Sequence, residues 1–159
     1  VPALLAKVGG LDARELWKVY LPVILVSFVL MVPVVFVAEK RRAHRGALRG
    51  AVAGLVLVCA LLPAASHGFY TLAVALTGFF VAFNVLEALQ PSLVSRVAPQ
   101  AYKGLALGFY NTAQAAGLFT GGALGGWVAS HSGAGAVFVG AAVLAALWLV
   151  VTWALKPLA

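Results

Sequence analysis

Three long runs of this 159-residue chain contain no charged residue, and they constrain its fold more than any other feature. They cover residues 19–38, 50–86 and 104–155 and are 20, 37 and 52 residues long. A membrane-spanning α-helix needs about 20 mainly apolar residues. The first run therefore holds one span, the second holds one span and most of another, and the third holds two spans. The strands of a membrane β-barrel would alternate apolar and polar residues, which these runs do not. We therefore predict an all-α membrane protein with five full transmembrane helices, at about 17–38, 48–65, 69–97, 101–129 and 134–155.

The composition agrees with this prediction, because only 9% of the residues are charged and soluble domains average about 25%. The net charge of +7 would suggest nucleic acid in a soluble protein. Here the basic residues flank the spans, so we expect the lipid bilayer as a partner and no nucleic acid. Residues 1–10 resemble the end of a sixth span, and the chain starts at Val1. We expect a fragment of a longer protein.

The basic residues also predict the orientation in the membrane. Short loops that are rich in Lys and Arg face the cytoplasm. Eight such residues fall on one predicted side, namely Lys40, Arg41, Arg42, Arg45, Arg49, Arg96, Lys103 and Lys156. The other side has three, offset by two acids. The eight-residue side is therefore predicted to be cytoplasmic, as is the C-terminal end of the chain.

An acid stands in the third predicted span, where Glu87 shares a helical stripe with Asn84, and Gln90 lies at its edge. Inserting Asp, Lys or Arg at the centre of a membrane helix costs roughly 2.5 to 3.5 kcal/mol. Such residues usually face a bundle interior and mark ion or substrate pathways. Two interpretations stay open. Glu87 either handles a proton or cation, or holds a fixed hydrogen bond or ion pair to another helix.

The fourth predicted span carries polar residues on one face, followed by a row of small residues. Tyr110, Asn111 and Gln114 could bind a substrate or form hydrogen bonds between helices. The small residues stand at four-residue spacing, with two further glycines beside them: Ala113, Gly117, Gly121, Gly125, Gly122 and Gly126. Such spacing lets another helix approach closely. We expect this glycine row to permit helix packing and movement.

The sequence shows no sign of an enzyme. It contains none of the G-x-S-x-G, H-E-x-x-H or phosphate-loop patterns. His44, His67 and His131 all fall in predicted loops or turns, and none has a partner at metal-ligand spacing. We predict neither catalytic activity, nor a metal, nor a cofactor.

The run FFVAFNVLEALQPSLVSRVAPQAYKGLALGFYNTAQAAGLFTGGALGGW resembles the second half of a major facilitator superfamily transporter, and most of all the YajR-like branch of the drug:proton antiporters. WKVYLPVILVSF and VFVAEKRR fit helix eight and the loop after it. The resemblance covers nearly the whole chain and implies a fold of two six-helix halves, of which this chain is the C-terminal one. Glu39-Lys40, with Arg41 among the basic residues that follow, resembles the family's acid-base loop motif, although the expected upstream glycine is missing.

The resemblance implies a multi-pass protein of the bacterial inner membrane that exports small amphipathic compounds by alternating access, driven by the proton gradient. Glu87, Asn84, Gln90, Asn111, Gln114 and Tyr110 would then line the substrate and proton pathway. Its partners would be the N-terminal half and a small-molecule substrate. Two alternatives stay open, which are a metabolite uptake symporter and a non-transporting membrane scaffold that packs other helices through the glycine row.

Overall fold

The computed structural model describes residues 2–10, 12–65 and 67–154, and all regular structure in these ranges is helical. The order is α1 (Pro2–Gly9), a 3-10 turn (Ala13–Glu15), α2 (Trp17–Lys40), α3 (His44–Ala65), α4 (Phe69–Val97), a second 3-10 turn (Gln100–Tyr102) and α5 (Lys103–Ala154). The last four α-helices are long and apolar enough to cross a membrane. The prediction of an all-α membrane protein is thus confirmed. The expected end of the last span at Leu155, and the basic residue Lys156, lie outside the described residues.

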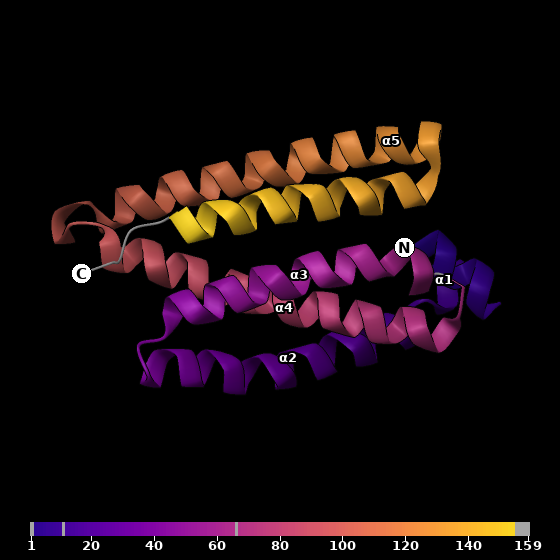
Figure 1. Ribbon diagram of the computed structural model, residues 1–159, viewed down its shortest axis with the longest axis horizontal. Helices are drawn as coiled ribbons and strands as arrows, with labels where there is room; N and C mark the ends of the chain where they lie inside the picture. The colour runs from indigo at the N-terminus through magenta and orange to yellow at the C-terminus, as the bar shows by residue number, and fades with distance from the viewer. Residues whose placement is uncertain (1, 11, 66, 155–159) are drawn as a thin grey trace.

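The helix α5 reverses direction at Gly133, where φ is +80° and ψ is 171°. Figure 1 shows its two arms running back alongside each other, and Val137 of the second arm approaches Gly125 of the first. Glycine reaches positive φ without the steric cost of a Cβ atom. The expected turn at 130–133 is therefore reduced to one residue, because the helix continues through Ser130, whose hydroxyl bonds the carbonyl of Trp127.

The centre of the fold is α4, which packs against α1, α2, α3 and α5. Near one end, Leu5 of α1 is fully buried with Leu62, Leu72 and Phe138. Near the other end, a second cluster joins residues of α2, α3 and α4: Ala38, Leu48, Ala51, Val52, Val85, Leu86 and Leu89. These apolar contacts hold α2 and α3 on α4.

The second arm of α5 packs on α3. The Arg49 guanidinium lies 4.7 Å from the centre of the Trp153 ring, and its Nε donates to the Thr152 carbonyl at 3.3 Å. The long helices lie roughly along a common axis, and the chain reverses its direction from each one to the next (Figure 1). The α2–α3 turn, the α4–α5 connection and the end of α5 therefore gather at one end of the bundle. We call this the basic end, because Arg41, Arg42 and Arg96 lie there.

Candidate functional site

The acid of α4 contacts the first arm of α5. Gln114 Nε2 donates to Glu87 Oε1 at 2.6 Å. Three residues further along α4, Gln90 Oε1 accepts from the Tyr110 hydroxyl at 3.0 Å. Because 87 and 90 share a helix face, as do 110 and 114, the two bonds form neighbouring rungs between the helices. We call these four side chains the polar pair site.

The polar pair site is open on one side in this chain. Glu87 is exposed, while Gln90, Gln114 and Tyr110 are half-buried. The carboxylate therefore has one amide partner and a free approach from outside. The hydrogen bond to another helix, which one interpretation of Glu87 expects, is thus present. The other interpretation, that Glu87 handles a proton or cation, stays a prediction.

The structure separates Asn84 from Glu87, although both lie on the predicted stripe. Asn84 Nδ2 donates to Ser27 Oγ on α2 at 3.0 Å, and the Ser27 hydroxyl donates to the Ile24 carbonyl. Ser27 is fully buried. Asn84 therefore joins α4 to α2, whereas Glu87 faces α5. Ser27 was not among the predicted residues. It could have been noticed because it is the one Ser, Thr, Asn or Gln in the charge-free run 19–38.

Asn111 is exposed, and its side chain makes no hydrogen bond within the part of the chain that the structure describes. It does not join its neighbour Tyr110 in the contact with α4. Of the predicted pathway residues, four thus come together in the polar pair site. Asn84 and Asn111 lie outside it.

The glycine row of α5 is uncovered in this chain. A Cβ atom built on Gly117, Gly121 or Gly126 would meet nothing within 4 Å, and one on Gly125 would meet only Val137, at 4.0 Å. The described helices therefore leave this face free. The expectation that another helix packs there stays a prediction.

A charged cluster lies at the basic end and connects two helices. Arg96 Nη2 donates to Glu39 Oε2 at 2.6 Å, and Ser92 Oγ donates to Glu39 Oε1 at 3.2 Å. The acid of the expected Glu39-Lys40 pair therefore has its partner on α4, across the bundle. All three side chains in these bonds are at least partly exposed. Arg96 was expected only to mark the orientation, and Ser92 was not among the predicted site residues.

Residues 5–159 match the family model of the Major Facilitator Superfamily. The chain belongs to this superfamily. Its members are transport proteins, which agrees with the absence of enzyme motifs in the sequence.

The chain is similar to three curated transporters. It is 41% identical over 148 residues to the inner membrane transport protein YajR of Escherichia coli K12, covering 93% of this chain and 33% of YajR. It is 27% identical over 115 residues to an uncharacterized transporter of Buchnera aphidicola subsp. Acyrthosiphon pisum, covering 72% of this chain and 30% of that transporter. It is 26% identical over 133 residues to an uncharacterized transporter of Buchnera aphidicola subsp. Baizongia pistaciae, covering 83% of this chain and 34% of that transporter. The resemblance to a YajR-like transporter is thus confirmed, and the chain spans about a third of each relative's length. No solved structure matches the chain significantly.

Proposed function

We propose that this chain forms most of the C-terminal half of a proton-coupled exporter of small amphipathic compounds, which works by alternating access. In this proposal the two arms of α5 cross the membrane separately. The chain then has five spans, at helix positions eight to twelve, and α1 is the end of helix seven. The missing half would complete the central cavity, and the protein would lie in a bacterial inner membrane, as the name of YajR suggests for that relative.

The observation that carries the proposal is the contact of Glu87 with Gln114 at 2.6 Å between two apolar helices. An acid within a membrane span is costly, and such residues mark proton relays and substrate pathways. Here the acid has an amide neighbour and one open side. Driven by the proton gradient, protonation of Glu87 would weaken its attraction for a cationic substrate and promote release. No further cofactor is needed for this cycle.

The orientation of the bundle supports the same proposal. The basic residues of the α2–α3 turn lie at the same end of the bundle as Arg96, which pairs with Glu39 at the end of α2. By the positive-inside rule this end faces the cytoplasm, which would place the C-terminal end of the chain there as well.

Glu87→Gln in the native-length protein tests the proposal. Glutamine has nearly the same shape and its oxygen can still accept from Gln114, so packing is kept while proton binding is lost. We expect the accumulation of ethidium inside inverted membrane vesicles, which corresponds to efflux from the cell, is driven by an acidic lumen and is followed by fluorescence, to fall to the level of vesicles without the protein. The matched control is Glu15→Gln, because Glu15 ends the 3-10 turn before α2 and pairs with Lys18 in the first turn of α2, away from Glu87. This variant should transport normally.

Unchanged gradient-driven efflux in Glu87→Gln would refute the role of Glu87. Uptake of a metabolite with protons, in place of efflux, would favour the symporter alternative. A native-length protein that carries no flux of either kind but still binds a membrane partner would favour the scaffold.

A further inference from the structure

A basic pocket lies where the α2–α3 turn meets the end of α4. It has a volume of about 620 Å³. Three arginines line it (Arg42, Arg45 and Arg96), together with His44 and an apolar wall formed by Leu93 and Val97. The acid nearest to His44 is Glu39, which already bonds Arg96 and Ser92. Because Glu39 is bonded to Arg96, it does not offset the positive charge that Arg42 adds to the pocket.

His44 is a buried side chain without a hydrogen-bond partner. Its side chain is 11% exposed, and neither ring nitrogen has a partner within the described structure. Its Nε2 lies 3.9 Å from Glu39 Oε2, which is too far for a hydrogen bond. Buried polar groups are nearly always hydrogen-bonded, so an unpaired one requires an explanation. Both nitrogens are shielded from solvent, so an acceptor oxygen in the pocket would become the missing partner only if the imidazole turned toward it.

Arg42 adopts a backbone conformation that favours glycine. Its φ is +51°, and Ala43 N–H donates to the Ala38 carbonyl across it, as in a helix end that usually carries glycine. A side chain that keeps this position against its steric cost is a candidate for function. Here the side chain adds a guanidinium to the pocket.

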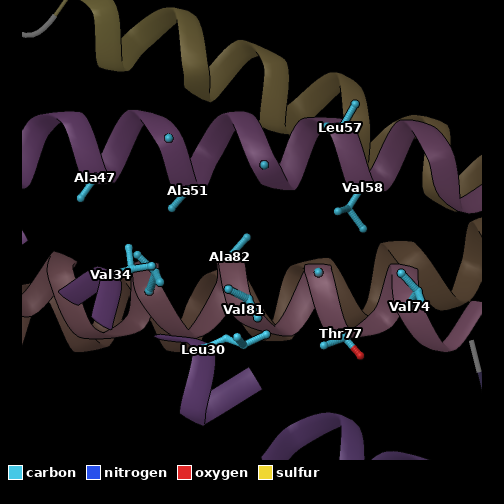
Figure 2. Close-up of a pocket in the computed structure, with 14 residues that line it drawn as sticks. Leu30, Val34, Ala47, Ala51, Leu57, Val58, Val74, Thr77, Val81 and Ala82 are labelled. Carbon is cyan, nitrogen blue, oxygen red and sulfur yellow. The ribbon is translucent and has the colours of Figure 1, made fainter. Parts of the chain in front are cut away.

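An apolar groove runs along α3 from this end of the bundle. It has a volume of about 660 Å³ and lies among α2, α3 and α4 (Figure 2). Small residues of α3 form one side of it, including Ala47, Gly50 and Gly54. A smaller hollow shares Val34 and Ala47 with the groove, and it shares Ala43 with the basic pocket. The three hollows therefore adjoin one another along the start of α3.

The length of this track suits one lipid chain. From Ala43 to Gly54 is 11 residues, or roughly 16 Å along a helix at 1.5 Å per residue. Half of the hydrocarbon core of a bilayer is about 15 Å thick. The groove thus reaches to about the middle of the membrane from the level of the arginines.

We propose that the basic pocket binds the phosphate of an anionic phospholipid from the adjacent leaflet, and that one acyl chain of this lipid lies in the groove. Arginines bind phosphate with two parallel hydrogen bonds, and basic pockets between membrane helices bind lipid head groups. A free phosphate would use the arginines but would leave the apolar wall and the groove empty. The lipid uses all three features, and its binding does not depend on transport.

Native mass spectrometry of the native-length protein tests this proposal without any substitution. The protein is released from nanodiscs that contain equal amounts of palmitoyl-oleoyl phosphatidylglycerol and palmitoyl-oleoyl phosphatidylcholine. We expect the retained lipid to be enriched in phosphatidylglycerol, and excess inorganic phosphate should not displace it. Equal retention of the two lipids would overturn the proposal. Displacement by phosphate would overturn it as well, because it would assign the pocket to a free anion.

Two pairs of variants locate the site. Arg42→Gly removes a charge and relaxes the positive φ, so a loss of enrichment would not reflect a damaged turn; Arg42→Lys should keep the enrichment. Gly50→Leu fills the groove, where a Cβ atom meets nothing within 4 Å, and should reduce retention. Gly104→Leu is equally unhindered on α5 and should not. Enrichment that persists in both Arg42→Gly and Gly50→Leu would place the lipid elsewhere and refute this site.

Discussion

The group formed by α2, α3 and α4 and the first arm of α5 are built from similarly apolar sequence, yet they differ in what covers them. In the packed group, Val52, Leu72 and Leu89 are at most 1% exposed. In the first arm of α5, Leu118 and Phe119 are 66% and 77% exposed. Apolarity alone therefore does not distinguish a helix whose side chains are buried within this chain from one whose side chains stay exposed in it. The polar pair site lies at the border between the two regions.

The largest effect is expected in the packed group. Leu89→Ala should lower the free energy of unfolding of the native-length protein by about 2–5 kcal/mol, since it removes a buried side chain and leaves a cavity. Leu118→Ala should change it by less than about 0.5 kcal/mol if its side chain faces lipid or a water-filled space. Unfolding in detergent, followed by circular dichroism, measures both. A loss at Leu118 as large as at Leu89 would show that the N-terminal half proposed above buries the first arm.

A smaller effect is expected at the glycine row. Gly121→Leu meets no obstacle within the described helices, but we predict that a helix of the proposed N-terminal half packs closely against it. The variant should then destabilise the native-length protein by about 1–3 kcal/mol, the usual cost of an overfilled contact. Thermal unfolding of Gly121→Leu beside Gly104→Leu measures this difference. If the two variants unfold alike, the row faces lipid and is no interface.

Much of the helical architecture was predictable, because a membrane helix follows from local composition. The predicted spans 17–38, 48–65 and 69–97 lie within α2, α3 and α4. The break in the last charge-free run was harder to place, since Gly133 is one of many glycines there and the helix passes through Ser130. Hydropathy does not say which glycine reverses the chain.

The partners of the polar residues could not be predicted, because they depend on which helices are neighbours. Glu39 has a basic residue next to it in sequence, yet its partner is Arg96, 57 positions away. Asn84 shares a stripe with Glu87, yet it bonds Ser27 of α2. Residues at 84 and 87 are only near neighbours around the helix, so a small rotation of α4 decides which helix each one meets. The rotation of α4 in this structure buries Val85, Leu86 and Leu89 against α2 and α3.

The smallest effect is expected at the hydrogen bond between Asn84 and Ser27. It tests whether Asn84 stabilises the helix bundle or takes part in transport. Ser27 Oγ accepts from Asn84 while it donates to Ile24, so Ser27→Ala and Asn84→Ala each remove the same interaction. Their coupling energy should be about 0.6 kcal/mol, the average for hydrogen bonds between membrane helices. A double-mutant cycle of unfolding free energies in detergent measures it. Ser27→Ala with Gln90→Ala is the control pair, because Gln90 bonds Tyr110 and should be additive within about 0.5 kcal/mol.

The same Asn84→Ala protein also distinguishes the two regions by transport. If Asn84 serves the packed group, the variant should lose stability but keep gradient-driven ethidium efflux per folded molecule, unlike Glu87→Gln. A variant that is fully stable but inactive would instead place Asn84 in the pathway with Glu87. In that case α4 would have to rotate during the cycle, since in the present structure the two side chains bond different helices.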